Sequence, residues 1–111
     1  FNIKNADEYG HDGKAEEKKA FLENIDAAIL PFLERTDIMI AVCGDHSTPC
    51  SVKDHSADPV PLIIRGDGCR VDNVSAYDEI SCAAGAMCRI SGAYLMPVLL
   101  DLIDKTHKYG A

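Results

Sequence analysis

One short stretch constrains the fold more than any other. Residues 37–43 read Asp-Ile-Met-Ile-Ala-Val-Cys, an apolar run without polar alternation. Such a run is typical of a strand that is buried on both faces of a parallel sheet. A helix is predicted before it, over about 14–34, because Phe21, Ile25 and Ile29 repeat at helical spacing. Strands alternating with helices favour an α/β layered fold.

Weaker patterns predict the remaining elements. Asp12 is a plausible N-cap for the helix over 14–34, and Pro31 should bend or shorten that helix. Ser75 is the expected cap of a short helix, and Pro97 fits only the first turn of the last one. The other expected elements are a strand end over 1–6, a polar loop over 7–13, a strand over 60–64, a helix over 75–84 and a helix over 92–108.

The charge balance and the cysteines exclude several classes of protein. Eighteen acidic residues stand against eleven basic ones, giving a net charge of −7, which argues against binding nucleic acid or anionic lipid. No apolar run approaches the roughly 20 residues that span a bilayer. Five cysteines without a regular framework favour reduced thiols and a cytoplasmic location, and the absence of a Cys-x-x-Cys pair argues against a cysteine zinc site.

Acidic residues and histidines gather in three loop clusters. They are Asp7 with His11, Asp45 with His46, and the run 54–58, which reads Asp-His-Ser-Ala-Asp and contains His55. Ligands of doubly wound sheets bind in the loops beyond the carboxyl ends of strands. Carboxylates and neutral imidazoles together suit divalent ions such as zinc or manganese, and two such sets side by side could hold a pair of metals for phosphoryl transfer.

A structural interpretation of these clusters stays open. Asp45 could be a turn former, His46 a solvated loop residue, and the two aspartates of 54–58 could cap turns. His107 is expected to be structural because it lies in the last turn of a predicted helix. Arginine side chains that could contact phosphate, but that ordinary surface charge explains as well, are Arg65, Arg70 and Arg89.

The motifs together resemble a known family. Residues 45–49, Asp-His-Ser-Thr-Pro, followed by 53–61, resemble the cofactor-independent phosphoglycerate mutases of the archaeal type, within the alkaline phosphatase superfamily. The upstream Asp7-x-x-x-His11-x-Gly13 matches the other half of that metal signature, and residues 96–111 resemble the C-terminus of the family. The resemblance implies the C-terminal part of a three-layer α/β/α domain with a mostly parallel sheet.

The resemblance also implies roles for individual residues. Asp7, His11 and His55 would hold one divalent metal, and Asp45 and His46 would contribute to a second. Manganese is the first expectation, with zinc, cobalt, magnesium or iron as alternatives. The nucleophilic serine and the remaining ligands of the second metal match no residue here, so no catalytic residue is expected within 1–111. The implied reaction interconverts 2-phosphoglycerate and 3-phosphoglycerate, a step of glycolysis, through a phosphoserine intermediate.

These observations lead to three functional hypotheses. The first is that residues 1–111, which begin at Phe1 in an apolar run, are the metal-binding C-terminal segment of a larger mutase, inactive alone and prone to self-association. The second is a segment of another phosphomutase, or of a phosphate- or phosphonate-ester hydrolase, from the same superfamily. The third is a small acidic metal-binding module that is complete as it stands.

Overall fold

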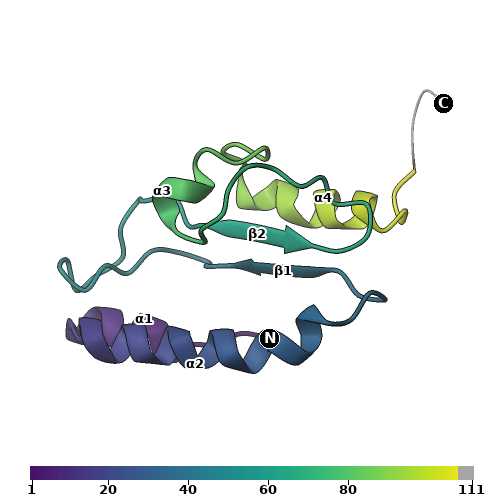
Figure 1. Ribbon diagram of the computed structural model, residues 1–111. Coiled ribbons are helices and arrows are strands. Elements are labelled where there is room, and N and C mark those ends of the chain that lie inside the picture. Colours follow the sequence, from purple (N-terminus) through teal and green to yellow (C-terminus); the bar gives the residue numbers. More distant parts are fainter. Residues whose placement is uncertain (108–111) are drawn as a thin grey trace. The chain divides into compact units, whose positions relative to one another are not determined.

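A computed structural model describes residues 1–107, and they form two compact units. The first unit comprises Phe1–Arg35 and Gly44–Val60, and the second comprises Thr36–Cys43 and the chain from Pro61 on. In chain order the elements are α1 (Asn5–Asp12), α2 (Ala15–Leu33), β1 (Ile40–Cys43), β2 (Leu62–Arg65), α3 (Glu79–Cys82), the 3₁₀ turn η1 (Gly92–Tyr94) and α4 (Leu95–Leu102). Figure 1 labels the α-helices and the strands.

Two predictions, a strand end over 1–6 and a polar loop over 7–13, are wrong because residues Asn5–Asp12 form helix α1. The helix ends in a Schellman motif at Gly13, which has a φ of 72°. The Gly13 N–H donates to the carbonyl of Gly10, and the Lys14 N–H donates to that of Tyr9. Glycine is favoured there because it adopts positive φ without a steric penalty. The polar residues of 7–13 therefore form a short helix with an exposed outer face, which hydrophobic periodicity does not reveal.

Helix α2 confirms the prediction over 14–34, apart from its cap. Lys14 occupies the N-cap position, whereas Asp12 ends α1 and accepts a 2.7 Å hydrogen bond from the Lys14 ammonium. The helix continues two residues past Pro31. It lies beside α1 in Figure 1, and the rings of Tyr9 and Phe21 make an edge-to-face contact with centroids 5.8 Å apart.

The second unit contains a two-stranded sheet whose direction is not the predicted one. Strands β1 and β2 pair antiparallel, with Ile40 opposite Arg65 and Cys43 opposite Leu62 (Figure 1). A parallel pair needs a crossover connection, usually a helix, whereas the segment between these strands holds none. The chain therefore returns in the opposite direction, and no strand within the described residues pairs parallel with β1.

Polar side chains fix the loops that follow β2. The predicted helix over 75–84 is the single turn α3, and its cap is Asp78 rather than Ser75. The Asp78 carboxylate accepts hydrogen bonds from the backbone N–H groups of Ile80 and Ser81, and these bonds lower its pKa. The Asp72 carboxylate closes a wider loop, because it accepts hydrogen bonds from the backbone N–H groups of residues 74 and 86.

The last helix is shorter than the predicted 92–108. It starts as η1 and continues as α4, with Pro97 in the first turn of α4 as expected. Asp104 adopts a φ of 55° just beyond α4, and the Lys105 N–H closes the end on the carbonyl of Leu100. His107 is thus beyond the helix rather than in its last turn. The predicted helix end at 108 and the last part of the family-like C-terminus, residues 108–111, lie outside the described residues.

No hydrophobic side chain among residues 1–107 is fully buried. On α2, the row formed by Phe21, Ile25 and Ile29 is half-buried, whereas Leu30 and Phe32 remain exposed. In the second unit Ile80 is 86% exposed. All five cysteines are free thiols. None of the described helices is both long enough and apolar enough to cross a membrane.

Tyr77 ties the two strands together and yields a stability prediction. Its hydroxyl lies 3.1 Å from the carbonyl of Val42 in β1 and 3.2 Å from that of Pro61, just before β2. Burial raises the pKa of Tyr77 to about 12, so the hydroxyl remains a donor at neutral pH. Tyr77→Phe should therefore lower the free energy of unfolding by about 1 kcal/mol in urea titrations at pH 7.

The pH dependence of this difference has a definite sign. Between pH 10 and 12 the unfolded chain loses a phenolic proton that folded Tyr77 keeps, so the original protein loses stability relative to Tyr77→Phe as pH rises through this window. Tyr94→Phe, at a side chain that is 64% exposed, is the matched control and should change little. Equal stability of the two variants at pH 7 would contradict the role given to Tyr77.

Candidate metal centre

Helix α1 presents the first two candidate ligands on one face. Asp7 and His11 are four residues apart, one helical turn, so their side chains are neighbours. The Nε2 atom of His11 lies 3.4 Å from Oδ1 of Asp7, and both side chains are partly exposed to solvent. Formation of α1, which the sequence did not predict, is thus what brings this pair together.

The loop between β1 and β2 supplies the third candidate ligand. An isolated backbone bridge between Ser47 and Ser56 closes this loop, and the Asp54 carboxylate accepts a 2.8 Å hydrogen bond from the N–H of His55. As a result, Nε2 of His55 lies 3.3 Å from Nε2 of His11 and 3.6 Å from Oδ1 of Asp7.

These three atoms fit a divalent cation. The atoms Asp7 Oδ1, His11 Nε2 and His55 Nε2 are separated by 3.3, 3.4 and 3.6 Å. The point in their plane that is equidistant from all three is therefore about 2.0 Å from each, which matches Zn–N and Zn–O bond lengths. One carboxylate and two imidazoles also form a donor set that zinc, manganese and similar ions accept. Within the described residues this is the one group of three such side chains whose ligand atoms lie close together.

A backbone carbonyl selects the tautomer of His11. Its Nδ1 atom lies 3.2 Å from the carbonyl oxygen of Lys53. A carbonyl can only accept, so Nδ1 carries the proton and donates it, which leaves the Nε2 lone pair free to bind a metal. Lys53 adopts a φ of 59°, an uncommon conformation for a residue with a side chain, and it ends a turn that begins at Pro49.

The other predicted pair, Asp45 and His46, lies beside this cluster. The imidazole of His46 lies against that of His55, with ring centroids 3.9 Å apart and the ring planes inclined at 33°. The Nε2 atom of His46 is 3.8 Å from Oδ2 of Asp45, whose side chain is 82% exposed. The first unit thus brings all five predicted ligands into one region, but residues 1–107 place no third candidate ligand with this pair.

Both aspartates of the run 54–58 accept hydrogen bonds within the loop, but only Asp54 bonds to the backbone as a turn cap would. Asp54 accepts from a backbone N–H, and Oδ2 of Asp58 accepts a 2.6 Å hydrogen bond from the hydroxyl of Ser56. Neither belongs to the group around Asp7.

Sequence reasoning missed three residues that shape the site: Gly10, Thr48 and Lys53. The hydroxyl of Thr48 donates a 2.6 Å hydrogen bond to Oδ1 of Asp7. This bond is the main cause that lowers the pKa of Asp7, and the nearby imidazole of His11 acts in the same direction. The position of Thr48 within the Asp-His-Ser-Thr-Pro motif was the available signal.

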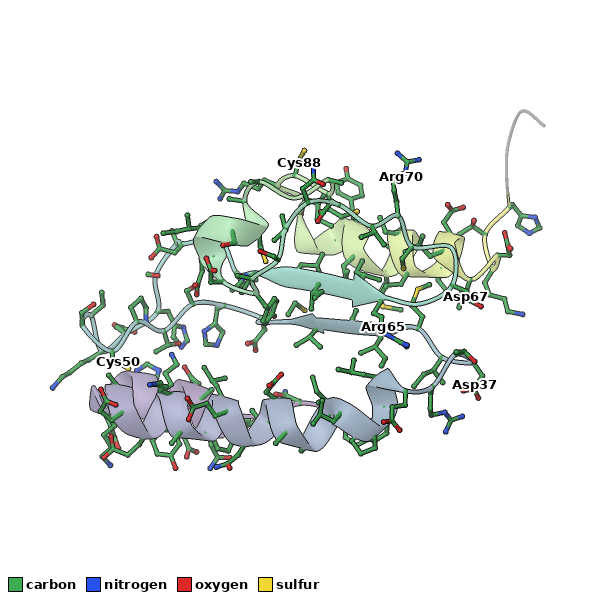
Figure 2. All side chains as sticks on the ribbon, in the orientation of Figure 1. Asp37, Cys50, Arg65, Asp67, Arg70 and Cys88 are labelled. Atoms are coloured by element: carbon green, nitrogen blue, oxygen red, sulfur yellow. The ribbon has the colours of Figure 1, made fainter. Side chains whose placement is uncertain are left out.

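Close contact between α1 and the loop also depends on Gly10. A Cβ atom at Gly10 would lie 2.4 Å from the carbonyl oxygen of Thr48, far inside van der Waals distance. Near the loop tip, the thiol of Cys50, labelled in Figure 2, makes a further contact at 3.8 Å with the carbonyl of Tyr9 in α1. Glycine therefore allows the helix that carries Asp7 and His11 to touch the loop that carries His55.

Comparison with known proteins shows the family of the chain. A family model described as the metalloenzyme superfamily matches residues 1–102. The chain belongs to the metalloenzyme superfamily. The matched range contains all five predicted ligands, and the family description implies the use of divalent metals.

Curated relatives in this superfamily are closely similar to the chain. It is 73% identical over 111 residues to a protein of Methanocorpusculum labreanum and 69% identical over 109 residues to one of Methanosphaerula palustris. Both are named 2,3-bisphosphoglycerate-independent phosphoglycerate mutase, which confirms the resemblance seen in the motifs. These matches cover 100% and 98% of this chain but only 27% and 26% of the relatives, so the chain spans about a quarter of their length.

A solved structure shares the fold. The PH0037 protein from Pyrococcus horikoshii matches 96% of this chain with a TM-score of 0.89 and 39% sequence identity. The match covers 29% of that protein.

The contact at Gly10 can be tested directly. Alanine favours helix over glycine by about 1 kcal/mol, so Gly10→Ala would stabilise α1 if the helix stood alone. Because the new methyl group meets the backbone of Thr48, we expect a net loss of about 1–3 kcal/mol in the free energy of unfolding. Gly92→Ala is the matched control, since nothing lies within 4 Å of a Cβ there. If Gly10→Ala proved as stable as Gly92→Ala in denaturant titrations, the close contact between α1 and the Thr48 backbone would be contradicted.

Proposed function

We propose that residues 1–111 are the C-terminal metal-binding segment of a cytoplasmic phosphoglycerate mutase that interconverts 2-phosphoglycerate and 3-phosphoglycerate. The observation that carries the proposal is the convergence of Asp7, His11 and His55 on one point, in a chain 73% identical to a segment of a protein with that name. The five free thiols support the cytoplasmic location.

The proposal assigns the ligands as follows. Asp7, His11 and His55 hold one divalent ion, for which manganese is our first choice, and Asp45 and His46 contribute to a second. When bound, such ions neutralise phosphoryl oxygens and lower the pKa of an attacking hydroxyl. Only two ligands come from this chain for the second ion, so we infer that residues outside 1–111 complete that site.

The hydroxyl groups near the cluster make hydrogen bonds that favour a structural role over one as the nucleophile. Ser47 donates to the carbonyl of Asp58, Thr48 donates to Asp7, and Ser56 donates to the Asp58 carboxylate. In each case the hydroxyl proton is engaged by an oxygen of the loop or of Asp7, so the hydroxyl serves to hold that part of the structure in place. This supports a nucleophilic serine outside the chain, and we expect the isolated segment to be inactive.

The exposed apolar side chains support a larger domain. No hydrophobic residue in 1–107 is fully buried, so apolar surface of the segment is available to pack against the rest of a larger domain. We propose that the complete domain has three α/β/α layers and a mostly parallel sheet, in which β1 and β2 form an antiparallel portion. Alone, the segment should self-associate through these apolar surfaces.

The superfamily match leaves other phosphate-ester chemistries as the alternative, because metal ligands do not select the substrate. We expect the full-length protein to interconvert the two phosphoglycerates in a coupled assay. His55→Ala removes a candidate ligand, so it should reduce kcat by more than the roughly 10–100-fold that is typical when a residue that only supports a metal ligand is mutated. Chelation should abolish activity, and added Mn²⁺ should restore it. His107→Ala, at an exposed residue beyond α4, is the control and should retain full activity.

Two outcomes would contradict the proposal. If the full-length protein hydrolysed phosphate esters but did not interconvert phosphoglycerates, the assigned reaction would be wrong while the metal centre stood. If His55→Ala kept near-full turnover at saturating Mn²⁺, the ligand assignment itself would be wrong.

A further inference from the structure

Thr48 has an environment unlike that of any other polar residue in the described chain. It is 5% exposed, and no other polar or charged residue among 1–107 is buried. It lies in sequence just after Asp45 and His46 and in space against Asp7. We propose that Thr48 is a positioning residue that links the two ligand sets into one dinuclear centre, an inference that rests on the proposed metal site.

The direction of its hydrogen bonds follows from simple chemistry. The Thr48 hydroxyl has one proton, and its oxygen lies 2.6 Å from Oδ1 of Asp7 and 3.1 Å from Nδ1 of His46. An ionised carboxylate can only accept, so the hydroxyl proton points to Asp7. The contact with His46 then requires that Nδ1 carries a proton and donates it to the Thr48 oxygen.

This arrangement fixes both partners. His46 takes the tautomer whose Nε2 lone pair is free, the same choice that the Lys53 carbonyl makes for His11. The oxygen of Asp7 that Thr48 holds is also the one that approaches His11 and His55. One hydroxyl therefore orients a ligand of the first ion and a ligand of the second.

The backbone of Thr48 is held as firmly as its side chain. Its carbonyl accepts a 2.8 Å hydrogen bond from the ammonium of Lys18 in α2. On the other side, Gly10 of α1 allows van der Waals contact with the Thr48 backbone and methyl group. Contacts from both helices thus keep the hydroxyl in place between Asp7 and His46.

Loss of the hydroxyl should weaken metal binding without reshaping the site. Valine has nearly the shape of threonine but cannot donate to Asp7 or accept from His46. His46 can then place its proton on Nε2, where it blocks metal binding. Outer-shell partners of metal ligands typically change affinity by about 10–100-fold, and we expect a loss in this range for Thr48→Val, larger for the second ion than for the first.

The test is calorimetric titration of the metal-free full-length protein with Mn²⁺. We expect two ions in the original protein, weaker binding in Thr48→Val, and recovery in Thr48→Ser, which restores the hydroxyl. Thr106→Val is the matched control, because Thr106 also donates a 2.8 Å hydrogen bond to an aspartate, Asp101, in the other unit. Its Mn²⁺ affinity should equal that of the original protein. Circular dichroism of each metal-free variant checks that it folds.

Each result bears on a distinct claim. If Thr48→Val binds both ions as tightly as the original protein, the positioning role is wrong while the proposed metal centre stands. If Thr48→Ser binds as weakly as Thr48→Val, the methyl group rather than the hydroxyl matters, and the inference is again overturned. If the original protein binds no Mn²⁺, the proposed function fails first. Should Thr48→Val not fold, Thr48→Ser decides: near-original affinity supports the inference, and a large loss overturns it.

Discussion

The first unit depends on one close contact, that of helix α1 with the loop between β1 and β2. The approach requires a residue without a side chain at Gly10, since any Cβ there would collide with the Thr48 carbonyl. It also requires hydrogen bonds that cross the contact, from Thr48 to Asp7 and from His11 to the Lys53 carbonyl. Asp7 and His11 come from one side of this contact and His55 from the other, so the candidate metal centre exists only while the contact holds.

The electrostatics of the cluster favour a cation between its three candidate ligand atoms. A carboxylate oxygen and two imidazole nitrogens lie 3.3–3.6 Å apart, close enough that their lone pairs repel unless a proton or a metal ion lies between them. Hydrogen bonds from the outside hold the ligands in this arrangement: the Lys53 carbonyl orients His11, and the Thr48 hydroxyl orients Asp7. The site is thus preorganised for a positive ion.

The candidate site was more predictable from the sequence than the fold. Aspartate and histidine in three clusters, together with the resemblance to a known metal signature, name the candidate ligands. The Asp-x-x-x-His spacing of residues 7–11 equals one helical turn, although the helix itself was predicted as a loop. Helix α1 escaped prediction because its polar outer face carries no apolar stripe. The antiparallel pairing of β1 with β2 was not predicted, because an apolar run indicates that a strand is buried but not in which direction its partner runs. Thr48 and Gly10 act through contacts 41 and 38 residues away, and no local pattern reports such contacts.

The central claim is that Asp7, His11 and His55 bind one divalent ion through the atoms that converge here. Anomalous diffraction at the manganese edge, from crystals of the full-length protein grown with Mn²⁺, tests it most directly. We expect a peak about 2.0–2.2 Å from Asp7 Oδ1, His11 Nε2 and His55 Nε2, a distance typical of metal–ligand bonds. An ordered site with no anomalous peak among these three atoms, in a protein that binds Mn²⁺ elsewhere, would contradict it.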